Sequence, residues 1–417
     1  MAVKRVIIHL GIPKTGTSSI QETLFNNNTI LEQNNFRYLR EWGRNHLLKL
    51  NRFFSEHLVS PAGSGNLGMN LNVKKLGKSV LNMQKVINNT PCENLIISGE
   101  YFHELYLDST IVNIKKFIQK YFEANGIDVA FVIFLRNPAD WIISFLQQRT
   151  FRYGFHHKQH DFFEWAMRRY KGVINFYKHF HSSLKILKFE DACLDKDGLV
   201  GHFLKTIGFP EEKLADIVMH RANESRSMEV MEFSCYIESI EPLFPRNFRH
   251  YNPNRFNGDL DCMININGAK FDLPYQGKIE LWNYMQETIH LVKESTGIDY
   301  TTSPPPAQHA QPLLYSEETI QGFIEVFPKL SIVLQKHFLR FFEKRYMETG
   351  ILRLKQLFYK DSIPFKIYNS KNVFTSLLKF RVYSFRKNLQ DKKAKRAMKM
   401  KNPLKLIKKA FKRIRKG

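Results

Sequence analysis

Residues 4–21 read KRVIIHLGIPKTGTSSIQ, an apolar run followed at once by a loop rich in glycine, lysine and hydroxyl side chains. The run at residues 4–10 predicts a short buried strand, which Gly11 and Pro13 end. Residues 11–19, called the phosphate loop below, place Lys14 between this strand and the helix expected next. Backbone N–H groups at a helix N-terminus, the helix dipole and a loop lysine together bind anions. The stretch therefore predicts a strand, an anion-binding loop and a helix.

The helix after the loop should begin near residues 17–19. Ser18 with Gln21, and Ser19 with Glu22, have the spacing of capping boxes. Beyond it, apolar runs alternate with helical patterns, which predicts an α/β fold with a central parallel sheet covered by helices on both faces. We expect further strands at 94–98, 129–135 and 184–189, helices at 110–124, 137–150, 160–181 and 197–207, and a helical C-terminal extension over 315–360.

The glycine spacing of the loop raises the alternative of a P-loop nucleotide kinase. Gly11 and Gly16 have the GxxxxG spacing, but the kinase pattern requires Lys and then Ser or Thr directly after the second glycine. Here Thr17 follows Gly16, and the lysine stands two residues earlier. The hydroxyl that would bind Mg²⁺ is therefore displaced, and the kinase remains the weaker alternative.

Residues 9–21, HLGIPKTGTSSIQ, resemble the 5′-phosphosulfate loop HxGxxKTGTTSLQ of bacterial sulfotransferases that use 3′-phosphoadenosine 5′-phosphosulfate (PAPS). In that family the loop wraps the 5′-phosphosulfate. The resemblance implies a P-loop-like sulfotransferase fold, with PAPS as co-substrate and no metal. It also implies that Lys14 binds the bridging oxygen of the leaving group. The other residues implied to contact the nucleotide here are Thr15, Gly16, Thr17, Ser18 and Ser19.

A second stretch, residues 136–144 with the sequence RNPADWIIS, resembles the family's 3′-phosphate element. That element is an arginine at a strand end, a proline two residues on and a serine eight residues on. The resemblance implies that Arg136 and Ser144 hold the 3′-phosphate. Weaker resemblances lie at residues 95–100, 186–191 and 221–225, so that the similarity spans about residues 4–230. The family's RKG-type nucleotide element is not evident.

Sulfuryl transfer needs a base that takes the proton of the acceptor group. Glu100 is the first candidate, because it ends a predicted strand at the edge where α/β sheets bind ligands. His103 is the second. His9 lies inside the first strand and is interpreted as a hydrogen-bonded buried histidine.

Metal and disulfide chemistry find little support in the sequence. His156, His157 and His160 have helical spacing, but no carboxylate or cysteine at ligand spacing accompanies them, so no metal site is predicted. The four cysteines are too far apart for a metal knuckle or a CxxC pair. We interpret them as ordinary thiols of a reducing compartment.

The net charge of +24 is concentrated at the C-terminus, where residues 379–417 contribute +16. Leu404, Ile407, Phe411 and Ile414 recur at helical spacing among lysines and arginines, which indicates a basic amphipathic helix on an anionic membrane surface. A disordered, solvated tail is the alternative. The apolar run near the N-terminus is too short for a signal-peptide core, and no window approaches the ~18–20 apolar residues of a spanning helix. We therefore expect a cytoplasmic protein, or one at the cytoplasmic face of a membrane.

Together these features predict a sulfotransferase that moves a sulfuryl group from PAPS to a hydroxyl or amine of a glycan or lipid-linked acceptor. The expected organisation is a sulfotransferase domain at 1–300, with an insertion near 35–90 and an irregular segment at 246–277. A helical extension at 301–378 and a basic tail at 379–417 follow. The alternatives are the nucleotide kinase and a peripheral membrane or nucleic-acid-binding protein with a vestigial nucleotide site. No nucleic-acid motif accompanies the charge.

Overall fold

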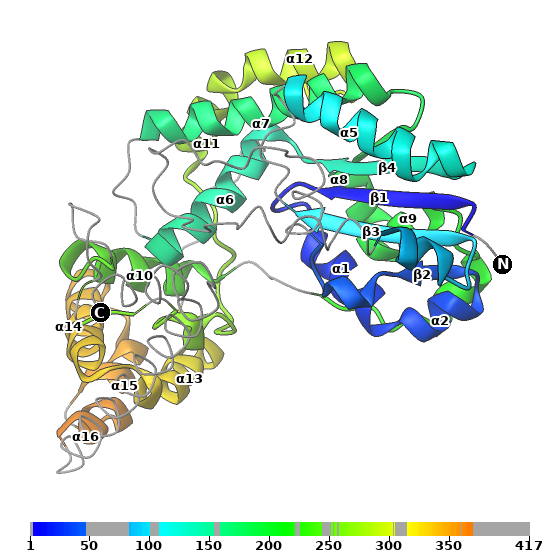
Figure 1. Cartoon of the computed structure of the whole chain (residues 1–417). Helices are drawn as coiled ribbons and strands as arrows, with labels where there is room; N and C mark the ends of the chain where they lie inside the picture. Colours follow the sequence, from blue (N-terminus) through cyan, green and yellow to red (C-terminus); the bar gives the residue numbers. More distant parts are fainter. Residues whose placement is uncertain are drawn as a thin grey trace, which may run out of the picture. The chain divides into compact units, whose positions relative to one another are not determined.

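The computed structural model describes residues 3–46, 83–100, 108–153, 159–221, 226–243, 252, 254–256, 258–302, 304, 315–359 and 361–369. Its centre is a five-stranded sheet in the order β2-β3-β1-β4-β5, in which all neighbouring strands are parallel (Figure 1). The strands are β1 (Arg5–Gly11), β2 (Phe36–Tyr38), β3 (Asn94–Glu100), β4 (Asp128–Leu135) and β5 (Leu184–Lys188). The predicted α/β class with a parallel central sheet is confirmed.

β1 lies in the middle because its side chains are apolar on both faces. Val6, Ile7 and Ile8 are completely buried, as expected for a strand whose sheet is covered on both sides. The parallel register pairs Gly11 with Glu100 at the carboxyl ends of β1 and β3. β4 runs parallel on the other side of β1. The segments that follow these three strands therefore leave the sheet at one edge.

Helices cover both faces of this sheet (Figure 1). One side carries α1 and α9, whose Ile20, Leu24 and Phe203 join Ile7 of β1 in one apolar cluster. On the other side, Phe131 of β4 packs against Phe176 of α7 with ring centroids 4.9 Å apart. The helices of this part are α1 (Thr17–Asn26), α2 (Asn28–Gln33), α5 (Asp108–Tyr121), α6 (Pro138–Tyr153), α7 (Gln159–Phe180), α8 (Phe189–Leu194), α9 (Gly198–Thr206), α11 (Tyr275–Tyr284) and α12 (Gln286–Thr296).

Two local predictions were wrong. The segment expected as an insertion from residue 35 begins with strand β2, a three-residue edge strand paired with β3. Residues 47–82 of that insertion lie outside the described part of the chain. The capping boxes are absent, because α1 begins at Thr17 with Gly16 as its N-cap and no side-chain cap bond. A left-handed glycine, rather than a serine, starts this helix.

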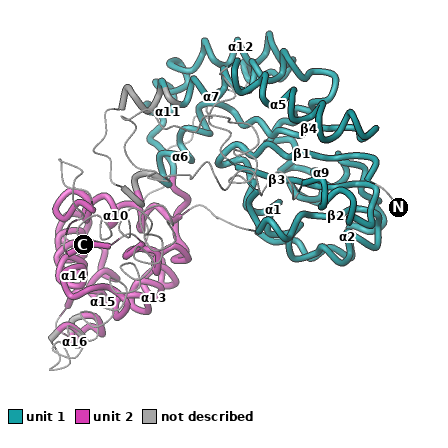
Figure 2. The backbone as a smooth tube through the Cα atoms, viewed as in Figure 1, with its two compact units in different colours: residues 1–149, 156–225, 272–311 teal, residues 150–155, 226–271, 312–417 magenta. Residues whose placement is uncertain are grey.

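The chain forms two compact units (Figure 2). Unit 1 comprises residues 1–149, 156–225 and 272–311 and contains the sheet. Unit 2 gathers described residues within 150–155, 226–271 and 312–417. Residues 226–271, which the sequence placed in the first domain, thus cluster with the C-terminal helices. The longer helices of unit 2 are α10 (Met228–Ile240), α13 (Glu317–Val326) and α14 (Ile332–Thr349), followed by α15 (Lys355–Phe358) and α16 (Ile363–Asn369).

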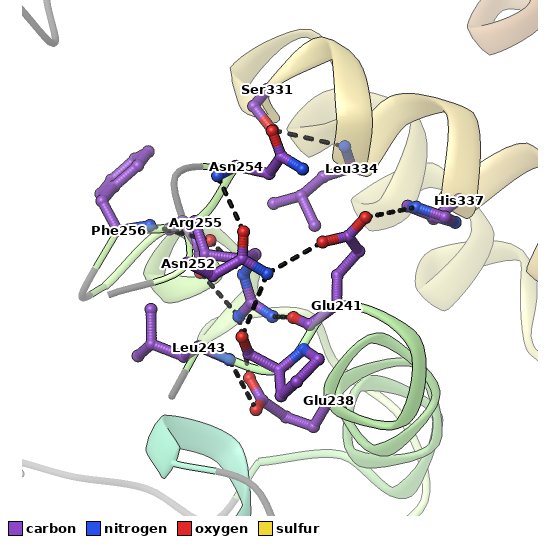
Figure 3. Close-up of polar contacts among 12 residues, drawn as sticks. Glu238, Glu241, Leu243, Asn252, Asn254, Arg255, Phe256, Ser331, Leu334 and His337 are labelled. Atoms are coloured by element: carbon purple, nitrogen blue, oxygen red, sulfur yellow. Dashed lines mark hydrogen bonds and ion pairs between the residues drawn. The ribbon is translucent and has the colours of Figure 1, made fainter. Parts of the chain in front are cut away.

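Unit 2 has its own apolar core and a buried charge network (Figure 3). The Arg255 side chain is only 1% exposed and lies 2.9 Å from Glu238 and 2.5 Å from Asp259. It also donates to the backbone carbonyl of Glu241, which ties the loop after α10 back to that helix. A buried arginine with two carboxylates and a carbonyl is compensated, and we read this network as structural.

Candidate functional site

The phosphate loop has a backbone shaped for an anion. After β1 ends at Gly11, residues 13–16 form a turn that leads into α1. Two residues of this turn are left-handed, Lys14 with φ 68° and Gly16 with φ 71°. Turns with left-handed residues are typical of anion-binding nests, in which backbone N–H groups line a concavity. The Thr15 N–H is used within the turn, where it donates to the Ile12 carbonyl at 3.4 Å, so any anion would be bound by the other N–H groups of the loop.

The two threonines of the loop brace it from inside. The Thr15 and Thr17 hydroxyls both donate to the carbonyl of Ile12, at 2.7 and 3.1 Å. Both residues are buried. Each hydroxyl proton is donated within the loop, so these two side chains shape it. Ser18 and Ser19 are partly exposed.

The glycines of the loop allow close packing. A Cβ added at Gly11 would lie 2.4 Å from the Thr17 methyl carbon, and one at Gly16 would lie 1.9 Å from Cδ2 of Leu199. Leu199 belongs to α9, so Gly16 allows that helix to pack directly against the loop.

Glu100 lies beside the loop at the end of β3. Burial raises the pKa of its carboxyl group, and the charge of Lys14 acts in the opposite direction. A carboxylate with a raised pKa is a stronger proton acceptor when ionised, which suits a general base. The second candidate base, His103, lies outside the described residues.

Arg136 follows β4 and reaches across to the phosphate loop. Its guanidinium donates to the backbone carbonyl of Lys14 at 3.2 Å and lies 5.2 Å from the ring centre of Phe189. The Tyr170 hydroxyl in turn donates to the Arg136 carbonyl at 2.8 Å. Ser144 lies partly buried in the second turn of α6. The structure thus brings Lys14, Glu100 and Arg136, which are far apart in sequence, to one edge of the sheet.

Two residues that sequence reasoning missed support this arrangement. Glu190 accepts a hydrogen bond from the backbone N–H of Asn137 at 2.8 Å, next to Arg136, and burial raises the pKa of its carboxyl group. Trp141 donates its indole N–H to the carbonyl of Pro13 at 2.5 Å. Glu190 lies in a stretch noted only for its resemblance to the family's strand end. Nothing in the sequence marked Trp141, whose partner is 128 positions away.

His9 is completely buried within β1, where its ring contacts those of Phe134 and Phe203. Its Nδ1 lies 2.8 Å from the Ser98 hydroxyl, which also accepts a hydrogen bond from Gln21. Its Nε2 is buried and has no hydrogen-bond partner among the described atoms. Burial lowers the His9 pKa to about 3, so the ring is neutral at physiological pH and serves the core.

The described part of the chain shows no sign of a metal site, a disulfide or a membrane span. No group of three His, Cys, Asp or Glu side chains in the described ranges is placed to hold a metal ion. His156 and His157, and the side chain of His160, lie outside what the structure describes. The four cysteines are free. Within the parts described, every helix is too short or too polar to cross a bilayer.

Several solved structures are similar to the chain, and two of them are the following. A sulfotransferase from Alicyclobacillus acidocaldarius is 15% identical, covering 57% of this chain and 93% of that one, with a TM-score of 0.31. A retinol dehydratase in complex with androsterone and the inactive cofactor PAP is 14% identical, covering 71% of this chain and 82% of that one, with a TM-score of 0.30. No protein-family model matches, and no curated protein matches the sequence.

Proposed function

We propose that the chain is a sulfotransferase that takes its sulfuryl group from PAPS. The observation that carries the proposal is the convergence of Lys14, Glu100 and Arg136 around a left-handed anion-binding loop. Transfer of a sulfuryl group from a 3′-phosphorylated nucleotide requires three groups. These are a cation at the loop, a base beside it, and a second cation at the end of the neighbouring strand.

The reaction is an in-line displacement at sulfur. The acceptor oxygen or nitrogen attacks the sulfur atom while the bond between sulfur and the bridging phosphate oxygen breaks. The acceptor proton passes to Glu100, and the leaving group is 3′-phosphoadenosine 5′-phosphate (PAP). Positioning and charge stabilisation supply most of the catalysis in transfers of this kind. Lys14 and the loop N–H groups meet the charge that develops on the leaving phosphate.

Arg136 and Ser144 are the proposed contacts of the 3′-phosphate. A guanidinium has five N–H donors, so the bond from Arg136 to the Lys14 carbonyl leaves it others for a phosphate. Charge-assisted hydrogen bonds are about twice as strong as neutral ones, which makes Arg136 the stronger of the two contacts.

The acceptor is proposed from the class of enzyme and from the basic tail. We infer a glycan or lipid-linked hydroxyl or amine at the cytoplasmic face of a membrane, with residues 379–417 contacting anionic lipid. The +16 net charge of that segment supports this choice, since lysines and arginines near an anionic surface each contribute about 1 kcal/mol.

Transfer of radioactive sulfate tests the function. Incubation of the protein with [³⁵S]PAPS and a cell-extract fraction should leave label on an acceptor, and calorimetry should show PAP binding more tightly than ATP with Mg²⁺. Tighter binding of Mg·ATP would favour the nucleotide kinase. If neither nucleotide bound and no label were transferred, the site would be vestigial and the proposal would be overturned.

A further inference from the structure

Lys14 is held in a conformation that costs free energy. A residue with a side chain at φ 68° is strained by about 1–2 kcal/mol, and such strain persists only where neighbouring groups enforce it. The strained residue is also the lysine proposed to meet the leaving group. The groups that hold its backbone therefore control where its charge lies.

The two peptide units that flank Lys14 are both held from the segment after β4. The carbonyl of the preceding unit, that of Pro13, accepts the indole N–H of Trp141 at 2.5 Å. The carbonyl of the following unit, that of Lys14, accepts the guanidinium of Arg136 at 3.2 Å. The orientations of these two planes define φ and ψ of Lys14. Because a trans peptide points its N–H opposite to its carbonyl, the bond from Trp141 also fixes the direction of the Lys14 N–H. The Thr15 N–H of the following unit is held within the turn, where it donates to the Ile12 carbonyl at 3.4 Å.

Trp141 is a rigid holder. It is completely buried, and its ring packs against those of Phe145 and Tyr170, with centroids 5.6 Å away in each case. It lies in the first turn of α6, whose start is fixed by Pro138 and by the bond from the Ala139 N–H to the Asn137 side chain at 3.0 Å. The indole N–H therefore has one fixed position relative to the loop.

We propose that Trp141 is a positioning residue for the nucleotide, holding the phosphate loop in its strained anion-binding form through the Pro13 carbonyl. This inference rests on the proposed function. Trp141 should act on the 5′ end of the nucleotide alone, whereas Arg136, which bonds to the loop, is also the proposed contact of the 3′-phosphate. Without the Trp141 bond, the loop relaxes in the free protein and ligand binding has to restore it, which lowers the apparent affinity.

Trp141→Phe, which removes the N–H donor and keeps an aromatic ring, tests this. Titration calorimetry with PAP and with AMP, which lacks the 3′-phosphate, should show both affinities falling by the same factor, about 5- to 30-fold for one buried hydrogen bond and its orphaned acceptor. Arg136→Ala should instead reduce PAP binding much more than AMP binding.

The matched control is Trp282→Phe, a second nearly buried tryptophan of unit 1 that lies in α11. It should lower the melting temperature without a selective loss of nucleotide affinity. If Trp141→Phe fails to fold, benzothienylalanine at position 141, in which sulfur replaces the indole N–H, keeps the shape of the ring and loses only the donor.

Wild-type affinity for PAP and AMP in either Trp141 variant would overturn the inference while leaving the proposed function intact. A loss for PAP but not for AMP would overturn it as well, because the effect would then belong to the 3′ end. Failure of the wild-type protein to bind either nucleotide would instead remove the proposed function.

Discussion

At the scale of single residues, the lysine of the loop makes the most direct prediction. Lys14→Ala removes the charge proposed to meet the leaving group, so turnover should fall on the order of 10²–10³-fold, as for loss of one charge-stabilising donor. The matched control is Lys4→Ala, just before the other end of the same strand, where the lysine pairs with Glu93 at 2.7 Å and is 71% exposed. The measurement is the rate of sulfate transfer by Lys14→Ala, by Lys4→Ala and by the wild type. Near wild-type turnover in Lys14→Ala would show that this lysine does not carry the chemistry.

Buried histidines of unit 1 predict how stability depends on pH. Burial lowers the pKa of His46 to about 4 and that of His9 to about 3. As pH falls below the ordinary value of ~6.5, the unfolded chain takes up protons and the folded chain does not. The free energy of unfolding should therefore fall as the pH is lowered from about 6.5. The contribution of each histidine levels off once the pH reaches the pKa that this histidine has in the folded protein. Each histidine contributes a slope of about 1.4 kcal/mol per pH unit.

Urea denaturation at pH 6.5, 5.5 and 4.5 measures that slope. His46→Gln should lower the slope by the contribution of one histidine, about 1.4 kcal/mol per pH unit. Carboxylate titrations are common to both proteins and cancel. An identical slope in His46→Gln and the wild type would refute the assignment of His46 as a neutral buried group.

The sequence predicts residues of the candidate site but not the groups that support them. Lys14 and Arg136 are predicted from the resemblance to two sulfotransferase elements, and Glu100 from its place at the end of a predicted strand. Trp141 and Glu190 were missed because their partners in the site, Pro13 and Asn137, lie 128 and 53 positions away. Such bonds follow from how α6 and α8 pack, which no local pattern records.

At the scale of elements, the contact between the phosphate loop and α9 predicts that a glycine-to-alanine change destabilises the protein more at Gly16 than at a glycine without such a contact. Gly16→Ala imposes a left-handed φ of 71° on alanine and drives its Cβ into Leu199. Gly126→Ala imposes the same penalty at φ 67°, with nothing within 4 Å of the new Cβ. The control should lose about 1–2 kcal/mol and Gly16→Ala clearly more.

Adding Leu199→Ala to Gly16→Ala should relieve the clash but not the backbone strain. In chemical denaturation, the double variant should lose less free energy of unfolding than the two single variants lose together. Strictly additive losses would mean that α9 does not press on the loop.

Element boundaries followed from sequence where the apolar runs are long. β4 was expected at 129–135 and spans Asp128–Leu135, with α6 starting at Pro138 as the Asn-Pro pair indicated. β2 was missed because three residues show no periodicity, and its pairing with β3 depends on tertiary contact. The start of α1 near residues 17–19 is confirmed, but the predicted serine caps are wrong, because the left-handed Gly16 caps the helix without a side-chain bond.

At the scale of the whole molecule, the basic tail separates an anchored enzyme from a freely diffusing one. The full chain should sediment with anionic but not neutral vesicles, and salt should release much of it, because the Debye length falls from about 10 Å at 0.1 M to about 3 Å at 1 M. Truncation after Leu378 should abolish sedimentation and leave PAP binding intact, since the residues proposed to bind the nucleotide precede residue 150. Equal sedimentation of both proteins would assign the anchor elsewhere.

The interleaving of the two units constrains how the protein is made. The chain leaves unit 1 after residue 225 and returns to it at residue 272. The returning segment contains α12, which packs against α7. On the ribosome, the first half of unit 2 therefore emerges before unit 1 is complete, and it has no partner until the helices after residue 312 are synthesised. Met231 and Phe233, which are buried in the finished core, would then be exposed on the nascent chain. During translation, the apolar residues of this first part of unit 2 thus have to be kept from aggregating until the C-terminal helices are made. Neither unit corresponds to one uninterrupted segment of the chain.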